Sequence, residues 1–464
     1  MVVQHNMQAA NANRMLNVTT SAQSKSTEKL SSGYRINRAA DDAAGLTISE
    51  KMRKQIRGLD QASTNAQDGV SSVQTAEGAL TEVHSMLQRM NELATQAANG
   101  TNSKDSDRQA IQDEIEQLTT EIDRVSETTK FNETYLLKGD AGTKAINLKA
   151  HDAGLKGTLT DNGDGTATFT MNELKAGDSV SIGGKTYKIG ASTKELKDML
   201  TKADIDNKQT DVVINGDTYK YKAALAPDTT STNKKDGYAA GWYKDGKTPD
   251  DTGAGTVHDA TYSNAADIAQ KVKAGTVEVG PDKLTIITDN DNDGVDDNDV
   301  SVISKEKAYT LAAGELLKAN QIGDTNNQAK VGIGDTYTAM TLNNATNSIK
   351  IHAGQAQVAN SLAFSLHVGA DADMTNKIQV NIDAMDSASL GIKGLNVKDD
   401  SGNAATYAVD AISDAISKVS SQRSSLGAVQ NRLEHTINNL DNVVENTTTA
   451  ESRIRDTDMA EEMV

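Results

Sequence analysis

Apolar and small residues recur at alternating steps of three and four along residues 45–99. The alternation is interrupted once, where Val73 is followed by Ala76 and then by Leu80. This spacing predicts a coiled-coil helix with one short stammer. At about 1.5 Å per residue the helix would span roughly 80 Å, which exceeds the core of an ordinary compact domain. We therefore expect at least one other segment to pack along it.

Two further segments carry the same kind of seam. In residues 105–129 the seam positions are Ile111, Ile115, Leu118, Ile122 and Val125. In residues 405–450 they are Ile412, Ile416, Val419, Leu426, Val429, Leu433, Ile437, Leu440 and Val444. None of the three stripes can bury itself, and each fully buried aliphatic side chain contributes about 1.5–3 kcal/mol. The pattern predicts that 46–99, 105–129 and 405–450 pack together as a helical rod.

Residues 2–36 form a weaker amphipathic segment, in which Met7, Met15 and Val18 belong to a sparse stripe among Asn, Gln, Ser and Thr. So little apolar surface cannot offset the entropy of ordering the segment. We expect a helix that is disordered in the isolated chain and ordered in an assembly, with a mobile leader as the alternative interpretation. A break at 31–34 and a small-residue connector at 37–46 separate it from the long helix.

The middle of the chain, residues 141–355, differs in composition and contains all three prolines and the only tryptophan. Glycine-containing turns predict hairpins at 158–170, 180–188 and 212–220, of which the last two form an internal repeat. Short helices are expected at 192–203 and 264–274, and a further hairpin at 362–380. The expected fold is α+β and multidomain, with a long antiparallel, coiled-coil-like helical rod from both chain ends and a β-rich middle region.

Composition narrows the function. The 464-residue chain has a net charge of −18 and no dominant basic patch, so nucleic acid and membrane insertion are not expected. The chain contains no cysteine, which excludes disulfides and thiolate chemistry. No cleaved secretory signal is expected at the N-terminus. Because the seven histidines are scattered and no phosphate-binding loop is present, we predict that the protein is not an enzyme.

An acidic loop at 289–299 has the spacing of a calcium loop. Asp289, Asp291, Asp293 and Asp297 offer carboxylate oxygens around Gly294, and such oxygens suit a hard cation. The EF-hand pattern requires glutamate at position 300, where this chain has Val300. The alternative interpretation, a solvated acidic turn without a metal, is the one we favour.

The helical ends resemble bacterial flagellin. At the N-terminal end the matching segments are 30–37, 40–46 and 87–93, and at the C-terminal end they are 422–433 and 451–458. The resemblance covers about half of the chain, residues 1–140 and roughly 360–464. In the family a further helix of roughly three dozen residues follows the 455–463 stretch, whereas this chain stops at Val464. We therefore expect residues 2–36 to lack their partner, and the chain alone not to form long native-like filaments.

The resemblance implies a subunit of the flagellar filament, exported by the flagellar type III system and located outside the cell. It implies other subunits, an export chaperone and a cap protein as partners. Residues 1–44 and 451–464 would belong to the inner tube, 45–140 and 356–450 to the rod, and 141–355 to an outward-facing variable middle. A hook-associated or junction protein with the same helical ends is the alternative.

The resemblance also implies recognition by Toll-like receptor 5. The family's contact residues correspond to Arg89, Leu93 and Glu114, with Gln88 and Gln96 nearby. Because Arg89 and Leu93 are four residues apart, they share one helical face, which we expect to point away from the seam. Without the resemblance, Arg89 and its neighbour Glu92 would be interpreted as an ordinary solvated pair. Arg432 is expected near this face as a subunit-packing residue, or else as an ordinary surface arginine.

Overall fold

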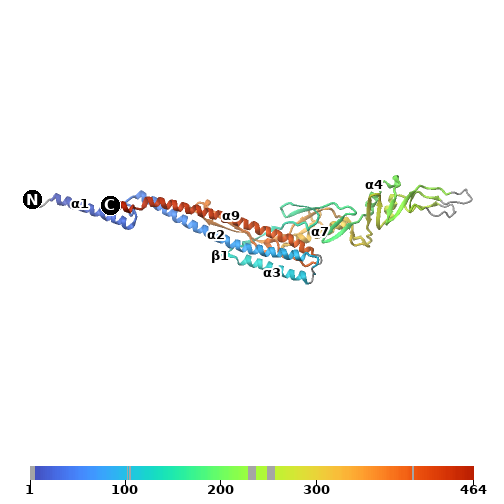
Figure 1. The fold of residues 1–464 in the computed structure, drawn as a ribbon, viewed down its shortest axis with the longest axis horizontal. Coiled ribbons are helices and arrows are strands. Elements are labelled where there is room, and N and C mark those ends of the chain that lie inside the picture. Colours follow the sequence, from blue (N-terminus) through green and yellow to red (C-terminus); the bar gives the residue numbers. More distant parts are fainter. Residues whose placement is uncertain are drawn as a thin grey trace.

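The computed structural model describes residues 6–101, 103, 106–227, 237–247, 257–399 and 402–463. The molecule is elongated, with both chain ends at one extremity and the most distal strands at the other (Figure 1). Residues 2–5 of the expected first helix, and residue 105 of the expected third segment, lie outside the described residues.

The rod is formed by three helices, α2 (Ala43–Ala97), α3 (Asp107–Thr128) and α9 (Asn403–Arg455). Helix α9 runs antiparallel to α2 (Figure 1), since Ser63 bonds to Asp441 near one end and Glu77 pairs with Arg423 further along. The predicted packing of the three seams is confirmed. The core of the rod contains residues from all three helices, among them Leu80, Leu87, Met90, Ile115, Ile122, Val419 and Leu426.

A glycine of α2 allows neighbouring elements of the rod to approach this helix closely. A Cβ atom built on Gly69 would lie 2.2 Å from Cδ1 of Leu366 and 3.3 Å from Cδ1 of Leu433. Gly69 therefore lets the hairpin of β19 (Leu362–His367) and β20 (Lys377–Ile382) pack between α2 and α9. The loop of this hairpin contains η1 (Met374–Asn376), and the hairpin itself was predicted at 362–380.

Short strands and a short helix cover the part of the rod that contains α3. β3 (Asp140–Asn147) pairs with β18 (Gln355–Asn360), and β1 (Lys130–Phe131) pairs with β2 (Thr134–Tyr135). Helix α8 (Ser387–Leu390) is buried against this part of the rod, where Asp123 of α3 accepts hydrogen bonds from Ser387.

A second layer begins beyond the rod, around α7 (Lys305–Asn320). Its strands form a four-stranded sheet of order β16-β17-β5-β4 and a three-stranded sheet of order β15-β7-β6. The strands are β4 (Gly157–Asp161), β5 (Thr166–Met171), β6 (Ser179–Ile182), β7 (Lys185–Ile189), β15 (Val302–Ile303), β16 (Lys330–Gly332) and β17 (Ser348–His352). Tyr407 of α9 belongs to this core and donates a 2.6 Å hydrogen bond to Glu315 of α7, which ties the layer to the rod.

The most distal part is a five-stranded sheet of order β11-β9-β8-β13-β14, packed on helices α4 and α6 around the buried Trp242. Its strands are β8 (Val212–Ile214), β9 (Asp217–Lys222), β11 (Gly241–Lys244), β13 (Gly275–Val279) and β14 (Asp282–Ile286). The helices are α4 (Thr193–Lys202), α5 (Ile205–Lys208) and α6 (Ala265–Lys271), and β10 (Gly237–Tyr238) pairs with β12 (Val257–His258).

The expected α+β fold is confirmed, including the hairpins β4–β5, β6–β7 and β8–β9 and the helices α4 and α6. Helix α7 was not predicted. The predicted helical segment 405–450 corresponds to α9, which begins at Asn403, where Asp399 accepts hydrogen bonds from the backbone amides of Gly402, Asn403 and Ala404. Among the described residues, no helix is both long enough and apolar enough to cross a membrane.

Candidate functional site: the rod surface and the junction of the chain ends

Arg89 on α2 and Glu114 on α3 meet at the surface of the rod. The Nε atom of Arg89 donates to Glu114 at 2.9 Å, and its Nη1 donates to Glu92 at 3.3 Å. The Arg89 side chain remains 50% exposed. Its hydrogen bonds, the one to Glu114 first, raise the pKa of Arg89 above its ordinary value. Two of the predicted contact residues, Arg89 and Glu114, are thus brought together in a charged, solvent-facing patch that spans two helices.

Gln88 and Gln96 flank this pair and are both exposed. Gln88 contacts His84 one turn earlier, with 3.1 Å between Nε2 of each side chain. Four of the five predicted contact residues, Gln88, Arg89, Gln96 and Glu114, therefore offer accessible side-chain atoms.

The expectation that Leu93 faces outward is wrong. Leu93 is only 2% exposed and belongs to the same core as Ile111 and Ile115 of α3. The prediction treated α2 as a helix with one narrow buried seam that packs against both α3 and α9. Because α3 covers a second flank of α2, a residue that lies off the first seam is buried as well.

Arg432 does not neighbour Arg89, contrary to the expectation. It is exposed on α9 beside the β19–β20 hairpin, with Ser365, Lys377 and Gln379 around it. The adjacent Leu433 lies against Gly69 of α2, twenty residues from Arg89 along that helix. At about 1.5 Å per residue, the two arginines are about 30 Å apart along the rod.

The two chain ends are joined by a short backbone ladder. Tyr34 and Asp456 form an antiparallel bridge, with the Arg35 amide donating to the Arg455 carbonyl at 2.7 Å. The Thr457 amide donates to the Gly33 carbonyl at 3.1 Å. Gly33 has a φ of 75°, so this glycine ends α1 (Met7–Ser32) and turns the chain into the ladder.

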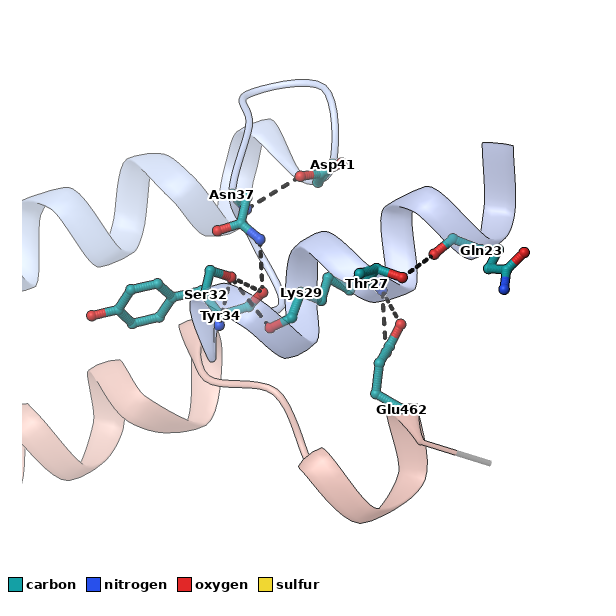
Figure 2. A network of polar contacts seen from close by, with 8 residues as sticks. All are labelled: Gln23, Thr27, Lys29, Ser32, Tyr34, Asn37, Asp41 and Glu462. Carbon is teal, nitrogen blue, oxygen red and sulfur yellow. Dashed lines mark hydrogen bonds and ion pairs between the residues drawn. The ribbon is translucent and has the colours of Figure 1, made fainter. Parts of the chain in front are cut away.

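Side chains reinforce this junction (Figure 2). Lys29 of α1 pairs with Glu462 of α10 (Met459–Glu462) at 3.4 Å, and Asn37 bonds to the Tyr34 carbonyl and to Asp41. The Arg455 guanidinium lies 4.6 Å from the centre of the Tyr34 ring. The expectation that residues 2–36 lack a partner within the chain is therefore wrong at the end of this segment, where Lys29, Tyr34 and Arg35 contact residues 455–462. These two segments lie at the ends of long helices that were predicted to pack together, and this position was the signal that could have indicated the contact.

Helix α1 extends beyond the junction, away from the rod (Figure 1). None of its residues is buried, and Met7, Met15, Leu16 and Val18 are between 61% and 78% exposed. Asn6 caps its start by accepting a hydrogen bond from the Ala9 amide. The predicted helix is therefore present, and it carries an exposed apolar stripe.

The acidic loop brings together three of its four predicted ligands. Asp289, Asp291 and Asp293 have carboxylate oxygens within 4.8 Å of one another, the only such group among the described residues. Asp297 is not in this group, since it accepts hydrogen bonds from Asn290. The carboxylates of the group accept backbone amides within the loop, and the Lys307 ammonium donates to the Asp293 carbonyl at 2.8 Å.

A rod formed from both chain ends, with a β-rich head and an uncovered amphipathic helix beyond it, defines an elongated subunit of the class that assembles side by side into a polymer. Two family descriptions match this chain. The bacterial flagellin N-terminal helical region matches residues 3–141, and the bacterial flagellin C-terminal helical region matches residues 409–464.

Curated relatives match over the whole length. Flagellin from Clostridium tyrobutyricum is 35% identical over 466 residues, covering 100% of this chain and 93% of the relative. Flagellin C from Vibrio cholerae is 34% identical over 460 residues, covering 99% and 90%. The chain belongs to the bacterial flagellin family and is a structural subunit of the flagellar filament.

A comparison with solved structures matched FliC from Burkholderia pseudomallei, which is 18% identical and covers 78% of this chain and 99% of its own, with a TM-score of 0.24. Hook-associated protein 3 from Legionella pneumophila is 14% identical and covers 87% and 98%, with a TM-score of 0.34. At these TM-scores neither superposition adds to the assignment.

Proposed function

We propose that this filament subunit is exported by the flagellar type III system and is recognised outside the cell by Toll-like receptor 5. An export chaperone and a cap protein are the further proposed partners. The observation that supports receptor binding is the exposed Arg89–Glu114 pair, which presents paired charges from two helices on one rigid surface. Gln88 and Gln96 extend the surface along α2.

Leu93 is left out of the proposed contact surface because its side chain is buried. Its contribution to receptor binding would be indirect, since it holds α2 against α3 and so fixes the distance between Arg89 and Glu114. Arginine is a frequent anchor of protein interfaces, and its planar guanidinium can bind a receptor carboxylate with two hydrogen bonds.

The experiment is the affinity of the receptor ectodomain for the wild-type chain and for Arg89→Ala. We expect Arg89→Ala to weaken binding by about tenfold or more, as for other interface anchors. The matched control is Arg124→Ala, which removes an exposed arginine of α3 that pairs with Glu121 of the same helix. Unchanged affinity of Arg89→Ala, or an equal loss in the control, would refute the assignment.

The arrangement in the filament follows from the same proposal. Residues 1–44 and 451–464 would lie in the inner tube, 45–140 and 356–450 in the surrounding rod, and 141–355 on the outside. The exposed apolar stripe of α1 supports the first part, because such a stripe requires a partner. Arg432, exposed beside the hairpin, would contact a neighbouring subunit.

A further inference from the structure

A cluster of cations lies on α2 near the junction of the chain ends. Lys51, Arg53, Lys54 and Arg57 fall within seven residues, with Glu50 directly before them and Asp60 three residues after Arg57. At 3.6 residues per turn they cover an arc of about 160° on the side away from the seam residue Ile56. None of the four forms an ion pair with any residue that the structure describes. We call these four residues the basic arc.

The basic arc contrasts with the rest of the chain. Residues 1–57 contain nine basic and four acidic residues, in a protein whose net charge is −18. The hairpin loop packs next to the arc, since a Cβ on Gly58 would lie 2.9 Å from Cβ of Ala370. Asp371 of that loop forms no described ion pair with the arc. The four cations therefore form no ion pair with the described residues, and Lys51, Lys54 and Arg57 are exposed.

Helix α3 carries the opposite charge. Seven acidic and two basic residues lie between Asp107 and Thr128. Both basic residues are already engaged: Arg108 is buried and donates to backbone carbonyls, and Arg124 pairs with Glu121. Three exposed acids share the face of α3 opposite its seam and form no described ion pair. We call these residues, Asp113, Glu116 and Glu127, the acidic stripe.

The basic arc and the acidic stripe cannot meet within one chain. Helix α3 runs antiparallel to α2, since Arg108 bonds to the Ala97 carbonyl and Glu114 to Arg89. At about 1.5 Å per residue this register places the stripe roughly 30–50 Å from the arc along the rod. Two copies displaced along the rod axis by that distance bring the two surfaces together. Such a contact joins different surfaces of identical copies, so it propagates into a helical polymer instead of closing as a dimer.

We propose that the basic arc of one copy packs against the acidic stripe of a neighbouring copy that is displaced along the rod axis. The proposal deepens the role as a filament subunit and rests on it. Charge complementarity sets the displacement, because unscreened opposite charges favour one relative position of two otherwise similar rods. Screening confines the attraction to close approach, since the Debye length is about 8 Å at physiological salt.

The direct test is carbodiimide cross-linking, which joins an amine to a carboxylate that touches it without adding a spacer. A mixture of unlabelled and ¹⁵N-labelled full-length chain is cross-linked after assembly, and the linked peptides are identified by mass spectrometry. We expect mixed-label links from Lys51 or Lys54 to Asp113, Glu116 or Glu127. We expect them to fade at about 1 M salt, where the Debye length is about 3 Å. Assembled chains that yield links only between other residues would overturn the proposal while leaving the filament role intact.

Charge reversal provides the second test. Arg53→Glu/Arg57→Glu and Glu116→Lys/Glu127→Lys are each expected to lose these links and to assemble poorly. An equimolar mixture of the two variants should recover both, because each reversed surface then meets its complement. The matched control, Lys197→Glu/Lys202→Glu on α4, changes charge by the same amount and should behave as wild type. Folding of each variant is verified by its helical circular dichroism. Wild-type assembly by either variant alone, no recovery in the mixture, or a wild-type chain that stays monomeric at low salt would overturn the proposal.

Discussion

Leu93 offers the sharpest test of how the rod is held together. The side chain is 2% exposed and lies in the core shared by α2, α3 and α9. Leu93→Ala removes three carbon atoms from this core, and such substitutions cost about 2–5 kcal/mol because the surrounding residues fill the cavity only in part. For a helical unit of this size, that loss corresponds to a decrease in melting temperature of roughly 4–20 °C.

The assay is thermal unfolding followed by helical circular dichroism, together with hydrogen exchange of the peptides that cover 87–97 and 111–122. We expect Leu93→Ala to melt earlier and to exchange faster in both peptides. The matched control is Leu16→Ala, which makes the same change at a site that is 66% exposed and should leave both measurements unchanged. A Leu93→Ala variant that melts like wild type but loses receptor affinity would refute the burial argument, because Leu93 would then act as a contact residue.

Three further predictions concern other parts of the chain. Gly69→Ala should lower the melting temperature, because the new Cβ would lie 2.2 Å from Leu366; Gly78→Ala, on open surface of the same helix, should not. Burial lowers the pKa of His151. Below about pH 6.5 the unfolded chain therefore binds a proton more readily than the folded chain, and the free energy of unfolding should decrease as the pH is lowered. His151→Gln should flatten this dependence in urea titrations, and an equal slope in the variant would count against it. Calorimetry should detect no calcium binding to the 289–297 loop at millimolar calcium, since its carboxylates already accept amides; a saturable heat would support the calcium interpretation instead.

The rod could be predicted from the sequence because a repeated seam reports directly on burial. Every seam residue from Val73 to Ala97 is buried as expected, including Ala76, where the alternation of steps is interrupted. The seam pattern did not predict all buried positions where a helix contacts more than one partner. Leu93 is off the predicted seam, and its burial depends on which flank of α2 is covered by α3, which the seam pattern does not give.

The middle was predicted in part, for a different physical reason. Hairpins such as β4–β5 were found because glycine and asparagine mark tight turns locally. Helix α7 was missed because alanines dominate its buried side, and Ala308, Ala312 and Ala319 resemble neutral positions in the sequence. They become core residues only because strands of the neighbouring sheets approach them closely.

The candidate sites were harder to predict than the fold, because they are formed by contacts between residues that are distant in the sequence. Arg89 and Glu114 were named as contact residues only through the resemblance to flagellin, and their hydrogen bond was not predicted because it joins residues of two helices. The junction of Tyr34 with Asp456 contradicts the expectation that residues 2–36 lack a partner within the chain, although both segments had been assigned to the inner tube. Arg432 was misplaced because the relative register of α2 and α9 is not encoded in either seam alone.

The central claim is that both chain ends lie inside a filament and residues 141–355 lie outside it. Immunogold electron microscopy tests this most directly, with the chain expressed in a bacterium whose own flagellin forms filaments that can incorporate it, and with an antibody that is raised against the isolated peptide 264–274 and does not bind that flagellin. We predict label along the whole length of the filaments, and none from an antibody against residues 7–32. Label confined to the hook–filament junction, or labelling of 7–32 along intact filaments, would contradict the account.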